Sequence, residues 1–173
     1  MKNIILTGMP GTGKTTAGKH ISTSLGFDFY DTDEILQNIH NRKISEWFKT
    51  DEDGFRQAEE KIFERLSKMN HSVIATGGGT VLEPSSRLIM RSSMTVWLKT
   101  APGVLVERMR TEMRPLFNPH EDLENQISDL YDSRLPLYAD SSLFSIDTGI
   151  LTVEEVSNVV QQLWNTLFSN NLR

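Results

Sequence analysis

The stretch that most constrains this chain is a short apolar run followed directly by a glycine-rich loop, over residues 4–16. Residues 4–6, Ile-Ile-Leu, predict a buried strand. Residues 8–15 then match the spacing G-x-x-x-x-G-K-[ST]. Glycine carries no Cβ, so successive backbone N–H groups can turn inward and form a nest for an anion. The sequence therefore predicts a phosphate-binding loop, and with it a bound nucleoside triphosphate.

The residues around this loop support that interpretation over the alternative, a chance glycine-rich turn. Lys14 can reach the β- and γ-phosphates as a point charge, and the Thr15 hydroxyl can ligate Mg²⁺. A helix predicted from Lys14 to about Leu25 directs its positive end toward the same phosphates. Because strand, loop, Lys-Thr pair and amphipathic helix occur together, we favour the phosphate site.

The length and composition indicate one ordinary globular domain over residues 1–173. A net charge of −5 predicts no general attraction to nucleic acid or to an anionic membrane. The chain has no cysteine, which excludes disulfides, thiolate zinc sites and a cysteine nucleophile. No apolar run approaches the length of a signal-peptide core or a membrane span. We therefore expect a protein of the cytoplasm, where ATP and Mg²⁺ are plentiful.

Apolar runs that predict strands alternate along the chain with segments of helical periodicity. The predicted strands cover residues 4–6, 27–30, 72–76, 94–98 and 143–146. This alternation predicts an α/β fold with a mainly parallel sheet. In such sheets the ligand lies beyond the carboxyl ends of the strands, so motifs at those ends are expected to converge. A helix from about Leu123 is expected to end near the proline of Arg134-Leu-Pro-Leu-Tyr138.

Two aspartates and an arginine–glutamate pair are the first candidates for chemistry. Asp31 and Asp33 follow the second predicted strand. One could bond a metal-bound water while the other faces a substrate hydroxyl, or both could cap the next helix, and the residues alone leave these alternatives open. Arg56 and Glu59 lie three residues apart on a predicted helix, and this spacing alone favours a surface ion pair.

Three further features also lie beside predicted strand or helix ends. Gly77-Gly78-Gly79 follow a strand directly, and three glycines in that place favour a role facing a ligand. Arg114 lies in a polar stretch typical of a mobile lid, with a solvated basic loop as the alternative. Arg134 offers a guanidinium for bidentate recognition of a carboxylate or phosphate, with a structural cap as the alternative.

Together these motifs closely resemble the shikimate kinase family, within the small-molecule kinases related to nucleoside monophosphate kinases. The resemblance covers nearly the whole chain and rests on residues 8–16, Asp31-Thr-Asp33, Phe55-Arg-x-x-Glu59, Gly77-Gly-Gly79, Arg114-Pro-Leu116 and Arg134-x-Pro-Leu-Tyr138. It implies a three-layer α/β/α fold of the P-loop NTPase type, with a five-stranded parallel sheet in the order 2-3-1-4-5. It also implies transfer of the γ-phosphoryl group of ATP to the 3-hydroxyl of shikimate, in the biosynthesis of chorismate and the aromatic amino acids.

On the nucleotide side, the resemblance implies a cradle for the ATP phosphates formed by Gly11, Thr12, Gly13, Lys14, Thr15 and Thr16. Thr15 would ligate Mg²⁺, and Asp31 would act through the water shell of the metal. Arg114 would come down onto the phosphates with a lid at about residues 111–124, so that Lys14 and Arg114 are catalytic. An arginine before the lid often stacks on adenine in this family, and both Arg108 and Arg110 could fill that place.

On the acceptor side, the resemblance implies a substrate-binding segment at about residues 32–60. Asp33 would bond the shikimate hydroxyls and act as the catalytic general base. Arg56 and Arg134 would clamp the shikimate carboxylate in a pocket that is closed by Gly77, Gly78 and Gly79. The family usually works as a monomer, and we expect the same here.

Two other functions fit parts of the pattern. A kinase for another small metabolite, such as gluconate, would keep the loop and the aspartates but has less reason for two arginines beside a triple glycine. A catalytically silent nucleotide-binding module that regulates a partner has no need of Lys14, Asp33, Arg56 and Arg134 together. We therefore favour the activity that the resemblance implies.

Overall fold

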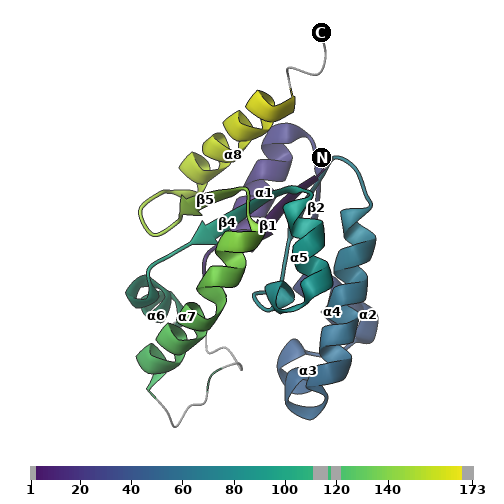
Figure 1. The fold of residues 1–173 in the computed structure, drawn as a ribbon, viewed down its shortest axis with the longest axis vertical. Coiled ribbons are helices and arrows are strands. Elements are labelled where there is room, and N and C mark those ends of the chain that lie inside the picture. Colours follow the sequence, from purple (N-terminus) through teal and green to yellow (C-terminus); the bar gives the residue numbers. More distant parts are fainter. Residues whose placement is uncertain (1–2, 111–116, 118–121, 169–173) are drawn as a thin grey trace.

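The computed structural model describes residues 3–110, 117 and 122–168. These residues form a parallel sheet of five strands in the order β2-β3-β1-β4-β5 (Figure 1). The strands are β1 (Asn3–Thr7), β2 (Asp28–Asp31), β3 (Ser72–Ala75), β4 (Met94–Lys99) and β5 (Phe144–Asp147). The α/β fold is therefore confirmed, together with the strand order that the resemblance implied.

Helices cover both faces of this sheet (Figure 1). Ile4 and Leu6 of β1 belong to the hydrophobic cluster on one face, to which α1 and α8 contribute, while Ile5 belongs to the cluster on the other face, to which α4, α5, α6 and α7 contribute. The split follows from the strand period of two, which directs successive side chains to opposite faces. The helices are α1 (Lys14–Leu25), α2 (Thr32–His40), α3 (Ile44–Thr50), α4 (Glu52–Ser67), the short 3₁₀ helix η1 (Thr80–Leu82), α5 (Pro84–Arg91), α6 (Pro102–Arg110), α7 (Leu123–Ser141) and α8 (Val153–Phe168).

The segment between β2 and the first turns of α4 has a small core of its own. Leu36 of α2, Trp47 of α3 and Phe55 of α4 are buried together. The rings of Trp47 and Phe55 meet edge to face, with their centroids 5.7 Å apart. Because α2 begins where β2 ends, this core keeps α2 and α3 near the carboxyl edge of the sheet. The substrate-binding segment predicted at about residues 32–60 coincides with this region, and its role in binding stays a prediction.

One helix boundary differs from the expectation. The helix predicted to end near Pro136 continues through it, since α7 extends to Ser141. A proline inside a helix removes one hydrogen bond and costs about 3 kcal/mol. Burial of Arg134, Tyr138 and Ser141 against the rest of the protein offsets that cost. As a consequence, Arg134 and Tyr138 lie one turn apart on the same face of one helix.

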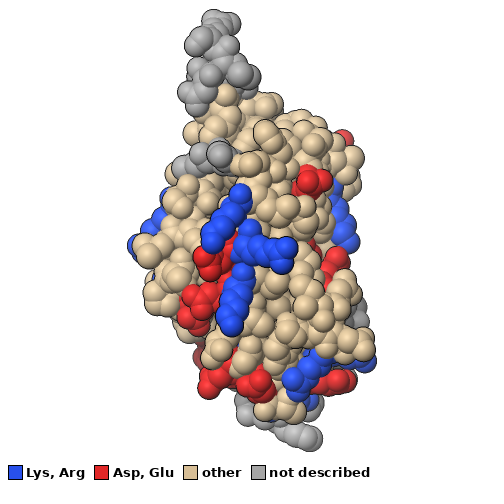
Figure 2. All heavy atoms as spheres, turned by 90° about the vertical axis from the view of Figure 1, so that its right-hand side faces the viewer, with Lys and Arg blue, Asp and Glu red and all other residues tan. Residues whose placement is uncertain are grey.

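The surface on the right-hand side of Figure 1 carries charges of both signs. Figure 2 shows basic side chains gathered near the middle of this face, with acidic side chains directly beside them. The face therefore presents mixed charges rather than one extended basic area. Within the described part of the chain, no helix combines the length and the apolar character needed to cross a membrane.

Candidate active site

The glycine-rich loop links β1 to α1 at the carboxyl edge of the sheet. Gly11 and Gly13 have φ angles of 83° and 85°, a conformation that residues with a Cβ rarely adopt. Gly13 is also the N-cap of α1, so the loop leads directly into the positive end of that helix. The chain can turn in this way because glycine occupies the two positions that require a left-handed backbone conformation.

Lys14 and Thr15 connect this loop to its surroundings. The Lys14 Nζ donates to the carbonyl oxygens of Gly8 and Met9, at 2.9 Å each, which places the charge over the loop. The Thr15 Oγ1 donates to Asp31 Oδ2 at 2.6 Å and so joins α1 to the end of β2. A cavity of about 450 Å³ opens here, lined by Gly11, Gly13, Lys14, Thr15, Thr16 and Arg108, among others. We call it the nucleotide cavity.

Asp31 has two roles that the sequence could not separate. Its Oδ1 accepts hydrogen bonds from the backbone N–H groups of Asp33 and Glu34, at 3.0 and 3.2 Å, as an N-cap of α2. Its Oδ2 accepts from Thr15 and lies at the nucleotide cavity. The capping alternative and the ligand-facing alternative are therefore compatible, because each uses a different oxygen of the same carboxylate.

The nucleotide cavity has an oxygen-rich donor set that fits Mg²⁺. This ion prefers oxygen ligands, keeps several waters and is usually held by one or two protein groups together with substrate phosphates. Thr15 and Asp31 supply such oxygen atoms beside the loop. Among the residues that the structure describes, no group of three or more His, Cys, Asp or Glu side chains could hold a metal ion. The site thus fits an ion shared with a bound nucleotide.

A second cavity, of about 420 Å³, lies next to the first and is lined by Asp33, Lys43, Phe48, Arg56, Arg134 and the three glycines 77–79, among others. We call it the acceptor cavity. Asp33 lines both cavities. The structure thus brings four predicted features, Asp33, Arg56, the triple glycine and Arg134, to one place. They come from α2, α4, the turn after β3, and α7.

Arg56 and Glu59 form a buried ion pair, not the surface pair that helix spacing favoured. Their Nη1 and Oε2 atoms are 2.7 Å apart, and the exposed fractions of the two side chains are 14% and 2%. Glu59 also accepts a hydrogen bond from Thr80 Oγ1 at 2.9 Å. A Cβ on Gly79 would overlap the Arg56 guanidinium, and one on Gly77 would overlap the Glu59 carboxylate. Glycine at these positions lets the turn pack directly against the ion pair.

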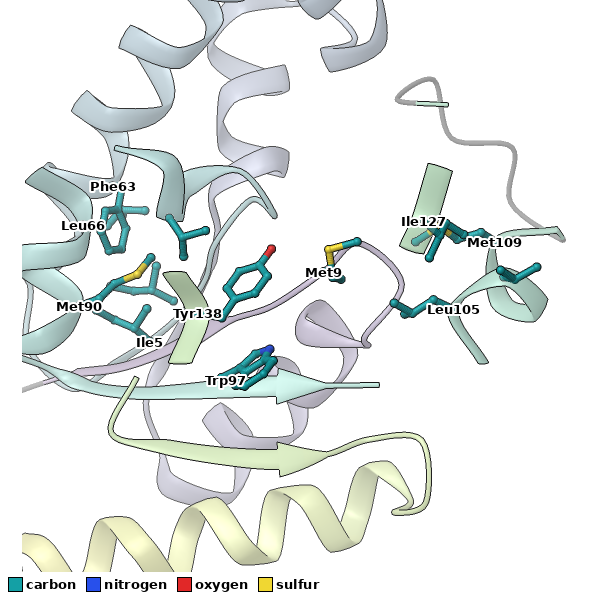
Figure 3. Packing of buried hydrophobic residues seen from close by; sticks show 13 residues of the cluster. Ile5, Met9, Phe63, Leu66, Met90, Trp97, Leu105, Met109, Ile127 and Tyr138 are labelled. Atoms are coloured by element: carbon teal, nitrogen blue, oxygen red, sulfur yellow. The ribbon is translucent and has the colours of Figure 1, made fainter. Parts of the chain in front are cut away.

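Arg134 and Tyr138 share one acceptor on the triple glycine. The carbonyl oxygen of Gly78 accepts from Arg134 Nη1 at 3.0 Å and from the Tyr138 hydroxyl at 2.6 Å. The Tyr138 ring lies over Trp97 of β4, with centroids 5.9 Å apart and planes 20° from parallel. Figure 3 shows this stacking, with the hydroxyl directed away from the sheet. Burial raises the pKa of Tyr138 to about 12, although the nearby Arg134 charge acts in the opposite direction.

This raised pKa predicts that stability falls at alkaline pH. The phenol titrates near pH 10 in the unfolded chain and at about 12 in the folded protein. Between these values the folded state keeps a proton that the unfolded state has lost, so the free energy of unfolding decreases by up to about 2.7 kcal/mol. Below the lower value Tyr138 causes no pH dependence. Urea denaturation from about pH 9 upward is expected to show a steeper decline for the wild type than for Tyr138→Phe, and equal slopes would contradict this assignment.

The two arginines proposed for adenine lie in different surroundings. Arg108 lines the nucleotide cavity and donates to the carbonyl oxygens of Thr148 and Gly11, at 2.7 and 3.3 Å. Arg110 pairs with Glu107 at 3.0 Å, and both side chains are more than 60% exposed. The geometry therefore favours Arg108 for a nucleotide contact. Arg114 lies outside the described residues, so its predicted role stays a prediction.

Several residues that line the acceptor cavity were not among the sequence candidates. Lys43 and Phe48 belong to this lining, and no local motif pointed to either. Glu59 also lines this cavity, whereas from the sequence it was named only as the partner of Arg56. Thr12, by contrast, was a sequence candidate for phosphate binding, but its side chain is buried and its Oγ1 donates to the carbonyl oxygen of Met9 at 2.9 Å. The Thr12 side chain thus stabilises the loop, and its predicted contact with the phosphates stays a prediction.

Comparison with known proteins agrees with this geometry. The sequence matches the shikimate kinase family model over residues 10–165. It is 40% identical over 163 residues to the shikimate kinase of Caldanaerobacter subterraneus subsp. tengcongensis, across 92% of this chain and 94% of that protein. The shikimate kinase of Thermodesulfovibrio yellowstonii is also 40% identical, across 92% and 93%. The structure of the Acinetobacter baumannii shikimate kinase in complex with shikimate has a TM-score of 0.87 and 30% identity, covering 100% of this chain and 96% of that chain. The chain therefore belongs to the shikimate kinase family.

Proposed function

We propose that the two adjoining cavities hold the two substrates of the shikimate kinase reaction, with ATP at the phosphate loop and shikimate in the acceptor cavity. The enzyme transfers the γ-phosphoryl group of ATP to the 3-hydroxyl of shikimate and releases shikimate 3-phosphate and ADP. The observation that carries the assignment of sites is the position of Asp33, which lines both cavities. A group between the two substrates is where a base for the acceptor hydroxyl is needed.

Shikimate is a small anionic polyol, and the acceptor cavity offers the groups that such a molecule requires. Arg56 and Arg134 supply guanidinium groups for the carboxylate, because planar forks bind carboxylates with two parallel hydrogen bonds. Asp33 supplies an acceptor for the hydroxyl groups. Phe48 and Phe55 supply an apolar wall for the ring. With its carboxylate at the two arginines, shikimate would direct its 3-hydroxyl toward Asp33 and the nucleotide cavity.

The chemical step is an in-line displacement at the γ-phosphorus. The oxygen of the 3-hydroxyl forms a bond to phosphorus while the bond to the β–γ bridging oxygen breaks, and the hydroxyl proton passes to Asp33. Lys14 stabilises the charge on the β- and γ-phosphate oxygens, and Arg114 adds to this when it reaches the phosphates. Thr15 would hold Mg²⁺ directly and Asp31 would hold it through a water molecule, and the ion would supply further charge neutralisation.

The remaining features of this proposal rest on the resemblance together with general chemistry. ATP is the phosphoryl donor, and Arg108 is the arginine that stacks on its adenine. Residues of about 111–124 form a lid, and residues of about 32–60 form the substrate-binding segment. The enzyme works as a monomer. It acts in the cytoplasm, where ATP and Mg²⁺ are available.

The acceptor is tested by measuring ADP release with ATP and Mg²⁺ against shikimate, gluconate and a nucleoside monophosphate in parallel. We expect turnover with shikimate alone and a product phosphorylated at the 3-oxygen, identified by nuclear magnetic resonance. Turnover only with another acceptor would overturn the assigned substrate. Binding of ATP without turnover of any acceptor would instead favour a regulatory nucleotide-binding module.

The role of Asp33 is tested in the same assay with Asp33→Asn. This change keeps the size of the side chain and removes its basicity, so turnover is expected to fall by about 10²–10⁴-fold while ATP still binds. Asp28→Asn, at an exposed aspartate in β2, is the matched control and is expected to keep wild-type turnover. Near-normal turnover of Asp33→Asn would remove Asp33 from the role of base.

A further inference from the structure

Each of the two arginines in the acceptor cavity shares its protein acceptor with a buried hydroxyl group. Glu59 accepts from Arg56 through Oε2 and from Thr80 through Oε1. The Gly78 carbonyl oxygen accepts from both Arg134 and Tyr138. The two arrangements are built from different elements, yet each consists of one guanidinium, one acceptor and one hydroxyl. Neither hydroxyl group belongs to a residue that lines the cavity.

Thr80 determines how Glu59 can bind Arg56. Thr80 and Glu59 are 1% and 2% exposed, so water cannot replace the Thr80 hydroxyl as a partner for Oε1. Without that hydroxyl, the Glu59 carboxylate is expected to turn both oxygens toward the Arg56 guanidinium, because a bidentate pair of hydrogen bonds is stronger than a single one. With Thr80 in place, the contact between Arg56 Nη1 and Glu59 uses the other oxygen alone. The Thr80 hydroxyl therefore limits how much of the guanidinium Glu59 occupies.

Tyr138 determines the orientation of the peptide that joins Gly78 and Gly79. A trans peptide is planar, and its C=O and N–H groups point in opposite directions. Two donors on α7 hold the Gly78 carbonyl toward that helix, so the N–H of Gly79 is directed the other way. Both glycines line the acceptor cavity. Tyr138 is fully buried and stacked on Trp97, which leaves its hydroxyl little freedom to move.

We propose that Thr80 and Tyr138 are positioning residues for the acceptor, each holding one of the two arginines and the adjoining backbone in the geometry that binds the substrate carboxylate. Neither residue touches the substrate. Thr80 acts through Glu59 on Arg56, and Tyr138 acts through the Gly78 carbonyl beside Arg134. The proposal rests on the proposed function, since it takes the acceptor cavity as the shikimate site. It adds the hydroxyl groups that orient the two arginines.

The test is steady-state kinetics of Thr80→Val and Tyr138→Phe in the full chain, each of which removes a hydroxyl with little change of shape. We expect the KM for shikimate to rise about three- to tenfold in each variant, while kcat and the KM for ATP stay within about twofold of wild type. Thr80→Ser keeps a hydroxyl and is expected to restore the wild-type KM. If Thr80→Val does not fold, Thr80→Ala replaces it, because it also removes the hydroxyl.

Two control variants separate positioning from a general loss of stability. Thr95→Val removes another buried hydroxyl, which donates to the Met90 carbonyl at 2.7 Å near the start of β4. Tyr131→Phe changes a second tyrosine of α7 that lines neither cavity. Both are expected to keep the wild-type KM for shikimate. The melting temperatures of all variants are measured alongside the kinetics.

The outcomes distinguish this inference from the proposed function. If the wild type phosphorylates shikimate but Thr80→Val and Tyr138→Phe have the same KM for shikimate as the control variants, the positioning role alone is overturned. Equal changes in kcat and in both KM values, following the loss of stability, would overturn it as well. A wild-type protein that fails to phosphorylate shikimate would instead overturn the proposed function.

Discussion

Replacement of Lys14 by Met is expected to reduce turnover to background while the protein still folds. The variant removes the positive charge next to the phosphate nest, and loss of one such electrostatic contact in a preorganised site lowers kcat by at least about 10²–10³-fold. The folded state loses the two hydrogen bonds from Nζ to the Gly8 and Met9 carbonyls. Their net contribution is about 1 kcal/mol each, so a drop of several degrees in melting temperature is expected, not unfolding.

The measurement for Lys14 is ADP release together with the melting temperature. Lys19→Met is the matched control, because Lys19 lies on the same helix, is 56% exposed and pairs with Glu34 at 3.4 Å. It is expected to keep both turnover and stability. Wild-type turnover in Lys14→Met would contradict the phosphate-loop interpretation.

Replacement of Arg56 or Arg134 by Ala is expected to raise the KM for shikimate strongly with little change in the KM for ATP. A charge-assisted hydrogen bond contributes about 1.5–3 kcal/mol, which corresponds to a rise of about 10- to 150-fold. Arg65→Ala, at an exposed arginine of the same helix as Arg56, is the matched control. An unchanged KM for shikimate in either variant would remove that arginine from the carboxylate clamp.

The two clamp variants are expected to differ in stability. Arg56→Ala leaves the Glu59 carboxylate buried without its ion pair, and breaking a buried pair in this way costs about 3–5 kcal/mol. Arg134→Ala leaves the Gly78 carbonyl with the hydrogen bond from Tyr138, so its loss is smaller. Urea denaturation of the two variants checks this order. The reverse order would mean that Arg134 rather than Arg56 balances the buried charge.

Much of the fold was predictable from the sequence because its determinants are local. The apolar run of β1, the glycines that turn the chain with positive φ and the helix that begins at Lys14 follow one another directly. The alternation of strands and helices predicted the parallel α/β sheet, and the resemblance added the strand order. Local rules failed at Pro136, where burial of Arg134 and Tyr138 outweighs the cost of a proline inside a helix.

The residue types of the candidate site could also be named from the sequence, and their roles stay predictions. Helix spacing placed Arg56 and Glu59 near each other but could not tell a surface pair from a buried one. Likewise, Arg108 and Arg110 were equivalent in the sequence. Only one of them faces the nucleotide cavity, because residues two apart on a helix point in different directions.

The sequence by itself thus determined the phosphate loop, the fold class and the set of candidate side chains. The tertiary structure alone decided that Asp33 lines two cavities and that Thr80 and Tyr138 share hydrogen-bond acceptors with the two arginines. These hydrogen bonds join residues 21 and 60 positions apart in the chain. Contacts of this kind depend on which faces of separate helices and turns meet in the folded protein. No local spacing or composition carries that information.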